Sequence, residues 1–442
     1  MDAESDQLPT TLLTLLSNSI VLRHVTPYIP VTSLLALAAT NKSFSAVIND
    51  QPEPWRYLDL TTVRSARIEF YAAPIDVGGV SWRAERMDES LTEDDFYAGP
   101  LRGIFSRFYA KQVLRNVQTL ILDGLSVPAD LVRDILCEDR YSVRILSLRG
   151  CGHLNQTKLQ QVLNYCVRPT RAEGTPKLRA LYLFQPKDAP RESLYHQRLE
   201  SGVPLGVTSS EGAQIGAEWN RKSETALSNS LSDDEMKWYG CTGRFMKRPL
   251  SGWSFTIAAC KGLIAFDAVL CRGPRHDITK TASKDFLHDT VATVALGSGG
   301  CESCHSCPEG PAVFGESAAS CLPLLSPPPT HASTVRAAQY PQTTATEVPK
   351  LILRCEDCLR GRWCERCNRW WCEDCYEEPV SRMQKEVVLQ QMSEGARDAS
   401  HPNGQESGMV GSAAVKVYSK LCVEHCLVSE MMSGAGSNGM WG

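Results

Sequence analysis

Hydrophobic positions near the start of the chain follow the spacing of an amphipathic helix. From residue 12 to residue 29, apolar side chains recur at steps of three and four and so share one helical face: Leu12, Leu15, Leu16, Ile20, Val21, Val25, Tyr28 and Ile29. Pro30 ends this pattern because proline interrupts a helix. Two further apolar runs, at 34–40 and 44–48, each follow residues that are favourable N-caps. Residues 8–54 are therefore predicted to form three short helices.

These predicted helices carry more leucine and valine than three short helices bury among themselves. One interpretation is that an apolar face binds a partner protein. The other interpretation is that the helices cap the domain that follows them. The hydrophobic pattern alone leaves both open.

A second pattern occurs five times after residue 54. The copies share the order apolar-x-x-apolar-x-apolar and lie at 55–63, 117–125, 143–151, 178–186 and 263–271. Alternate side chains of a strand point to the same side, so each copy predicts a short strand with an inner pair such as Leu120 and Leu122 on one side. Helical stretches such as 129–136 lie between the copies.

This alternation predicts an α/β fold, with an irregular leucine-rich-repeat solenoid over residues 55–296. Separate parallel strands of an ordinary α/β domain are the alternative. Residues beside the inner leucines are predicted to form an exposed face that binds a protein substrate, an interpretation that rests on strand alternation alone. These residues are Thr119, Ile121, Asp123, Ser147, Arg149, Ala180, Tyr182 and Phe184.

Three stretches follow neither pattern. Residues from about 196 to 236 are rich in serine, glycine and charge, which is typical of a disordered insert. Residues 297–350 are rich in cysteine and proline, and we predict an extended linker there. The C-terminal module, 351–442, contains another segment of flexible composition at about 393–413.

Composition and charge narrow the classes of partner. The chain has 442 residues, of which 43% are hydrophobic, so it is long enough for two or three domains. A formal net charge of -4 gives no basic excess, which argues against nucleic acid or an anionic membrane as partner. The first ten residues are acidic where a secretory signal is basic, so we expect an intracellular protein, cytoplasmic or nuclear. Lys261 and Asp267 argue against a membrane span at 253–271.

Eighteen cysteines in a reducing compartment are more typical of metal ligands than of a disulfide framework. Three C-x-x-C pairs lie between residues 355 and 375, and a fourth pair follows after a long gap. Thiolates at this spacing are typical ligands of tetrahedral Zn2+. The predicted zinc ligands are Cys355, Cys358, Cys364, Cys367, Cys372, Cys375, Cys422 and Cys426, with His425 as the alternative to Cys426.

Eight ligands predict two zinc sites. The loops between neighbouring pairs are short, so we favour an interleaved arrangement. In that arrangement one zinc binds Cys355, Cys358, Cys372 and Cys375, and the other binds Cys364, Cys367, Cys422 and Cys426. Closed cysteine-rich sites of this kind are structural rather than catalytic.

A third zinc site is a further hypothesis, with Cys301, Cys304, Cys307 and Cys321 as its ligands and His305 or His331 as an alternative ligand. The other cysteines occur singly and are interpreted as small core residues. They are Cys137, Cys151, Cys166, Cys241, Cys260 and Cys271.

With these features placed, the chain resembles fungal F-box proteins that carry leucine-rich repeats and a C-terminal cysteine-rich module. The helical segment 19–48 and the sequence PWRYLDL at 54–60 carry the resemblance at the N-terminus. It implies that residues of these helices contact a Skp-type adaptor or pack the F-box: Val21, Leu22, Val25, Ile29, Pro30, Leu34, Leu35 and Leu37, together with Phe44, Val47 and Trp55.

The resemblance implies a non-catalytic receptor of a Skp-cullin-F-box ubiquitin ligase. Such a receptor raises the effective concentration of a protein substrate near a ubiquitin-loaded enzyme on the cullin scaffold. One alternative is a RING-like zinc module that recruits a conjugating enzyme directly, with Trp363, Trp370 and Trp371 between its ligands. Another is a zinc-stabilised interaction scaffold unrelated to ubiquitin. The tryptophans are equally expected as packing around the metal.

Overall fold

The computed structural model describes residues 11–68, 93–186, 237–239, 243–244, 246–281, 285–297, 299–341, 348–376 and 415–429. The chain divides into two compact units. The first comprises Met1–Ala189, Pro249–Ala268 and Pro323–Tyr340, and the second comprises Pro190–Arg248, Val269–Leu322 and Pro341–Gly442. The inserts predicted at about 196–236 and 393–413 lie outside the described residues.

The first unit begins with four short helices where the sequence predicts three: α1 (Leu12–Ser17), α2 (Ser19–Val25), α3 (Val31–Thr40) and α4 (Lys42–Asn49). The difference arises at Asn18, whose side chain accepts hydrogen bonds from the backbone N–H groups of Ile20 and Val21 and so begins a new helix. Asn41 caps α4 in the same way. The side chain of Trp55 closes this group, because its indole N–H donates to the carbonyl of Ile48 at 2.7 Å.

All five copies of the repeated pattern contribute one strand each to a single sheet. The strands are β1 (Tyr57–Asp59), β2 (Thr119–Ile121), β3 (Ile145–Ser147), β4 (Ala180–Tyr182) and β6 (Ala265–Phe266). Neighbouring strands are parallel and follow chain order. The register places Leu58, Leu120, Leu146, Leu181 and Phe266 in one row across the sheet. The α/β class is thereby confirmed.

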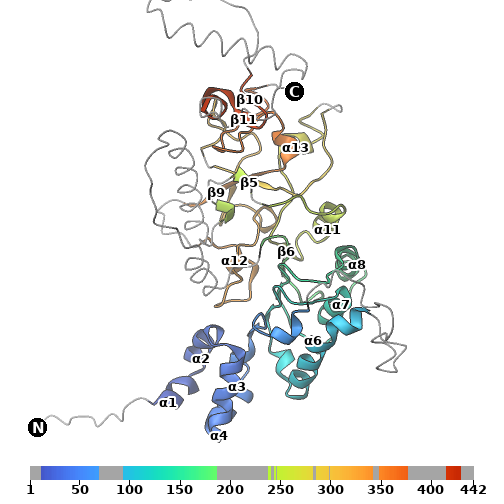
Figure 1. Cartoon of the computed structure of the whole chain (residues 1–442), viewed down its shortest axis with the longest axis vertical. Helices are drawn as coiled ribbons and strands as arrows, with labels where there is room; N and C mark the ends of the chain where they lie inside the picture. The colour runs from blue at the N-terminus through green and yellow to red at the C-terminus, as the bar shows by residue number, and fades with distance from the viewer. Residues whose placement is uncertain are drawn as a thin grey trace, which may run out of the picture. The chain divides into compact units, whose positions relative to one another are not determined.

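Helices return the chain between these strands, because parallel strands need crossover connections. They are α6 (Glu93–Ala110), α7 (Ala129–Cys137), α8 (Gln156–Cys166) and α11 (Trp253–Ala259). Helix α6 packs against α7, α7 against α8, and α8 against α11 (Figure 1). Helix α7 buries Leu131, Val132 and Ile135, and α8 buries Leu159 and Leu163.

A distant segment, Pro323–Tyr340, packs on the sheet face opposite the row of leucines, and we name it the covering segment. Its helix α12 (Val335–Ala338) and Leu324 pack against Ile145, Ala180 and Tyr182. The interpretation of 297–350 as an extended linker is therefore wrong for these residues. Their apolar side chains are few, but three of them are buried: Leu324 is 0% exposed, Ala338 is 2% exposed and Leu325 is 5% exposed.

The second unit contains a four-stranded antiparallel sheet and a hairpin. The sheet has the order β5 (Gly243–Arg244), β7 (Val294–Leu296), β9 (Lys350–Arg354) and β8 (Ala312–Val313). The hairpin consists of β10 (Val417–Tyr418) and β11 (Leu421–Cys422), and it is followed by the π-helical turn η8 (Val423–Leu427). Helix α13 (Glu356–Leu359) follows β9 directly.

Short 3-10 turns complete the described structure. Those of the first unit are η1 (Thr26–Tyr28), η2 (Glu53–Trp55), η3 (Arg64–Ala66) and η4 (Val113–Arg115). Those of the second are η5 (Lys237–Tyr239), η6 (Pro274–His276) and η7 (Ala319–Cys321). None of the described helices combines the length and the hydropathy that crossing a bilayer requires.

Candidate metal centres and binding surfaces

Within the described part of the second unit, side chains that could bind a metal ion gather in three groups of four. We name them site A (Cys271, His276, Cys355, Cys358), site B (Cys301, Cys304, Cys372, Cys375) and site C (Cys364, Cys367, Cys422, Cys426). Within each site, the sulfur or ring nitrogen atoms all lie within 4.8 Å of one another.

These distances fit a tetrahedral metal ion. Four thiolates at about 2.3 Å from a central zinc lie about 3.8 Å from one another. One sulfur pair is close to that distance in every site. The pairs are Cys271 with Cys358 at 3.8 Å in site A, Cys304 with Cys372 at 3.7 Å in site B, and Cys367 with Cys422 at 3.7 Å in site C.

Site A is largely buried and combines a loop with the start of a helix. Cys355 is the N-cap of α13, and its sulfur accepts the backbone N–H of Cys358 at 3.4 Å. The sulfur of Cys271 accepts the backbone N–H groups of Cys355 and Gly273. Residue 273 must be glycine for its backbone to lie this close to the sulfurs, because a Cβ there would lie only 2.8 Å from the sulfur of Cys358.

His276 is oriented for a metal by a backbone carbonyl. Its Nδ1 lies 3.0 Å from the carbonyl oxygen of Leu287, which only accepts, so Nδ1 donates to it and Nε2 is the ring atom that faces the sulfurs of the site. Nε2 lies 3.3 Å from the sulfur of Cys355. Burial lowers the pKa of His276, but hydrogen bonds to the sulfurs of Cys271 and Cys355 outweigh it and raise the pKa to about 10. A bound metal would replace that proton, since histidine ligates in its neutral form.

Site B is formed by a tight loop and the last C-x-x-C pair. The sulfur of Cys301 accepts the backbone N–H groups of Ser303 and Cys372 at 3.4 and 3.2 Å. Cys304 is exposed, and hydrogen bonds from the hydroxyl and backbone N–H of Ser306 lower its pKa to about 6. Such thiolate stabilisation favours metal binding.

Site C joins the middle C-x-x-C pair to the C-terminal hairpin. Cys422 ends β11, and its sulfur accepts the backbone N–H of Cys426 in η8 at 3.4 Å. His425 is exposed and does not belong to the group, so Cys426 is the ligand of this pair.

The structure brings together one predicted zinc set and corrects the other. Cys364, Cys367, Cys422 and Cys426 meet as the sequence predicts. The predicted set of Cys355, Cys358, Cys372 and Cys375 does not form, because the first pair meets Cys271 and His276 and the second meets Cys301 and Cys304. Spacing identifies a pair of ligands that share an ion, but it does not identify the distant pair that completes the site.

The hypothesis for the third site is half correct. Cys301 and Cys304 belong to site B, but Cys307 and Cys321 belong to none of the three groups. Cys271 was interpreted as a core residue and His276 was missed altogether. Their only signal in the sequence is a C-x4-H spacing, which is weak because it is not paired with another motif of its own.

Ligand order along the chain makes the three sites interdependent. The pairs occur in the order A, B, A, C, B, C, so sites A and B interleave and sites B and C interleave. A ligand pair of site A lies between the two pairs of site B in the sequence, and so does a ligand pair of site C. No site is therefore confined to a continuous segment of its own.

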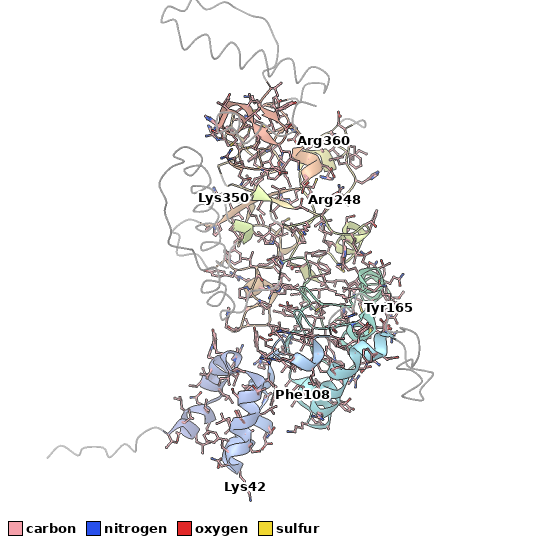
Figure 2. All side chains as sticks on the ribbon, viewed as in Figure 1. Lys42, Phe108, Tyr165, Arg248, Lys350 and Arg360 are labelled. Atoms are coloured by element: carbon pink, nitrogen blue, oxygen red, sulfur yellow. The ribbon has the colours of Figure 1, made fainter. Side chains whose placement is uncertain are left out.

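A buried cation ties the loops of the sites together. The guanidinium of Arg354 is 0% exposed, lies 2.6 Å from a carboxylate oxygen of Glu309 and 3.3 Å from one of Glu373, and stacks over the ring of Trp370. Burial alone would lower the pKa of Arg354, but the two glutamates raise it. By contrast, Arg248, labelled with Arg360 in Figure 2, forms an exposed pair with Asp357 that contributes little.

The side chains predicted to bind the adaptor differ in solvent exposure: some are buried, some are half-buried and some are exposed. Leu22 and Leu34 are 0% and 2% exposed, so their assignment to a partner contact is corrected: they pack the helices against one another. Val25, Pro30 and Leu35 are exposed. Val21, Ile29 and Leu37 are half-buried. Among the packing residues of the resemblance, Val47 and Trp55 are buried and Phe44 is half-buried.

The predicted substrate face is not an open surface. Seven of its eight residues are buried, and Phe184 is half-buried: Thr119, Ile121, Asp123, Ser147, Arg149, Ala180 and Tyr182 are each 5% exposed or less. The prediction of an exposed face is therefore wrong. Strand alternation identified which residues share a face, but it gave no sign that the covering segment lies there.

Specific hydrogen bonds hold the covering segment on this face. Tyr182 donates its hydroxyl to the carbonyl of Leu325 at 3.0 Å, and the hydroxyls of Thr119 and Ser333 lie 2.9 Å apart. Arg149 donates to the hydroxyl of Ser326 and pairs with Asp123 at 2.6 Å. Burial raises the pKa of Asp123, although the nearby Arg149 opposes this rise.

Comparison with protein-family models gives no match for this chain, and comparison with curated proteins gives none either.

Proposed function

We propose that this chain is the substrate-recognition subunit of a Skp-cullin-F-box ubiquitin ligase. In this proposal α1 to α4 bind the adaptor, the parallel strand and helix segments form a leucine-rich-repeat body, and three zinc ions hold the second unit. The chain itself performs no catalysis.

The supporting observation is a concentration of exposed apolar side chains on the N-terminal helices. Six of the fourteen large apolar side chains that are exposed in the described residues lie between residues 12 and 35: Leu12, Leu15, Ile20, Val25, Tyr28 and Leu35. Ile20 is 68% exposed and Leu12 is 56% exposed. Such a concentration of exposed apolar side chains is typical of a protein interface. The exposure favours a partner face over the interpretation that these helices only cap the next domain.

The order of elements supports the receptor interpretation. Four helices precede a sheet of sequentially ordered parallel strands, with β1 starting two residues after Trp55. This is the order that the resemblance to F-box proteins implies. Because the covering segment occupies the sheet face, we assign substrate capture to surface outside that face.

The ligand sets favour structural zinc. Site A offers three sulfurs and one nitrogen, and sites B and C offer four sulfurs each. Such sets fill all four positions around zinc and leave none for a substrate. The RING-like alternative has less support, because Trp363, Trp370 and Trp371 are each 5% exposed or less and pack in the core of the unit.

Reconstitution with purified Skp-type adaptor and cullin scaffold tests the proposal. We expect the full chain to co-elute with both in size-exclusion chromatography, and an Ile20→Asp, Leu35→Asp variant to elute separately. Leu34 is left unchanged because a charge at that buried position would unfold the helices. Phe255→Asp is the matched control, since Phe255 is also exposed but lies on α11. Two outcomes would refute the proposal. In one, the Ile20→Asp, Leu35→Asp variant co-elutes with the adaptor as the Phe255→Asp control does. In the other, the wild type itself does not co-elute.

A further inference from the structure

Three cysteines occupy corresponding places in successive helices of the first unit. Cys137 is the last residue of α7, Cys166 is the last residue of α8, and Cys260 directly follows α11. Because α7 packs against α8, their C-terminal ends lie together, and the sulfur of Cys137 lies 3.8 Å from the sulfur of Cys166.

The two sulfurs differ in access. Cys137 is exposed, whereas Cys166 is only 7% exposed. A small reagent from solvent therefore reaches Cys137 first. None of the groups that could hold a metal ion in the described residues includes either cysteine, so metal coordination does not account for their proximity.

We propose that Cys137 and Cys166 are a redox-active pair that forms a reversible disulfide, with a peroxide as the oxidant. A disulfide has an S–S distance of about 2.05 Å, so the two sulfurs must approach by a little under 2 Å. Rotation about the Cα–Cβ bond of a cysteine moves its sulfur by a comparable distance, and Cys137 is exposed. This inference does not depend on the ligase proposal.

The reaction proceeds in two balanced steps. In the first, the sulfur of Cys137 attacks one oxygen of hydrogen peroxide, the O–O bond breaks, and a sulfenic acid and one water form. In the second, the thiol of Cys166 passes its proton to the sulfenic oxygen as its sulfur bonds to the sulfenic sulfur, the S–O bond breaks, and a second water leaves. The two thiols supply the two electrons that reduce the peroxide.

The surroundings assign the roles of the two sulfurs. Burial raises the pKa of Cys166 to about 12, and the neighbouring sulfur of Cys137 adds to this effect. Cys166 is therefore not the group that attacks peroxide first, since its thiol keeps its proton and the thiolate is the form that attacks peroxide. It is placed instead to resolve a sulfenic acid that forms on Cys137.

The disulfide would join neighbouring segments of the sheet and helix body. Cys137 and Cys166 are 29 residues apart, and the link would close a loop that contains β3. In repeated architectures, stability depends on contacts between adjacent repeats, so a covalent link between two of them opposes local opening of either. Oxidation should therefore raise the melting temperature of the first unit, and a reductant should reverse the shift.

Peptide mapping of the full, zinc-loaded chain tests the pair. The protein is treated with hydrogen peroxide, quenched with an alkylating reagent and digested with trypsin. Cys137 and Cys166 fall in the tryptic peptides 134–140 and 159–171. We expect a cross-linked species of these two peptides, two hydrogens lighter than their sum, which dithiothreitol converts to the separate peptides.

Three variants make the result specific. Cys137→Ser changes an exposed residue and should abolish the cross-link while the protein stays folded, and Cys166→Ala should do the same. Cys321→Ser is the matched control, because Cys321 is half-exposed and belongs to no metal group of the described residues, and it should leave the cross-link intact. Separate alkylation of both cysteines after peroxide treatment, or oxidation of Cys137 without a bond to Cys166, would overturn the proposal.

Discussion

The sulfur of Cys304 lies 3.7 Å from the sulfur of Cys372, although 68 residues separate the two cysteines in the sequence. Both cysteines belong to site B. The chain between its two ligand pairs also supplies one pair to site A and one pair to site C. We therefore expect the second unit to depend on site B more than on either other site. A metal ion bound there would restrict the loops that supply sites A and C.

Zinc content measures this dependence. We expect three zinc ions per chain in the wild type, one for each group. Cys372→Ser removes a buried ligand of site B and should lower the content by more than one equivalent, because misplacing this loop disturbs sites A and C as well. Mass spectrometry of the metals in dialysed protein gives the ratio. A loss of one equivalent or less would show that the sites are independent.

A pair of variants distinguishes the metal ligands that the structure groups together from those that the sequence alone predicts. Cys271→Ser should lower the zinc content, because Cys271 is a ligand of site A. Cys307→Ser should leave it unchanged, because Cys307 lies outside the three groups and burial raises the pKa of its thiol to about 12. The same metal analysis checks both variants. Retention of three zinc ions by Cys271→Ser, or loss of one by Cys307→Ser, would contradict the assignment.

The covering segment should contribute strongly to the stability of the first unit. Leu324→Ala removes a fully buried side chain, and we expect the free energy of unfolding to fall by about 2–5 kcal/mol. Leu250→Ala is the matched control, since Leu250 is 62% exposed and its truncation should cost less than about 0.5 kcal/mol. Urea unfolding monitored by tryptophan fluorescence gives both values. Equal, small losses would mean that the segment rests loosely on the sheet.

Asp267 should make stability depend on pH. Its carboxylate accepts the backbone N–H groups of Leu183, Phe184 and Gln185, but complete burial has the larger effect and raises its pKa from 3.8 to about 6. A raised pKa in the folded state means that the folded protein holds the proton more tightly than the unfolded chain. The stabilisation is therefore complete below about pH 4 and is lost as pH rises through about 6.

The non-titrating variant Asp267→Asn isolates this contribution. Between pH 4 and pH 7, the free energy of unfolding of the wild type should fall by about 2 kcal/mol relative to the variant. Urea unfolding of both proteins at several pH values supplies the difference. A relative stability that rises with pH would contradict the shift.

Local pattern predicts local structure well in this chain. The five copies of the apolar-x-apolar pattern became five neighbouring strands because alternation of side chains is a property of each strand by itself. The extra N-terminal helix was missed because the cap at Asn18 interrupts an otherwise continuous apolar stripe. In the same way, three C-x-x-C pairs and Cys422 with Cys426 were recognised as ligands from their spacing.

Long-range pairing was less predictable. Nothing near Cys355 indicates that its partner pair is Cys271 and His276, because that contact depends on how the loops around β7 and β9 are joined. The covering segment was missed for a related reason. It contains few apolar residues and several prolines, so it has the composition of a linker, yet it buries Leu324 and Ala338 against a sheet formed far away in the sequence.

The affinity of the full chain for a purified Skp-type adaptor tests the central claim most directly. Isothermal titration calorimetry would compare the wild type with the Ile20→Asp, Leu35→Asp variant and with the Phe255→Asp control. The account predicts a Kd that rises at least about tenfold in the double variant, because charges replace apolar contacts, and stays within about twofold in the control. A double variant that binds as tightly as the wild type, or a zinc-loaded wild type that does not bind, would contradict it.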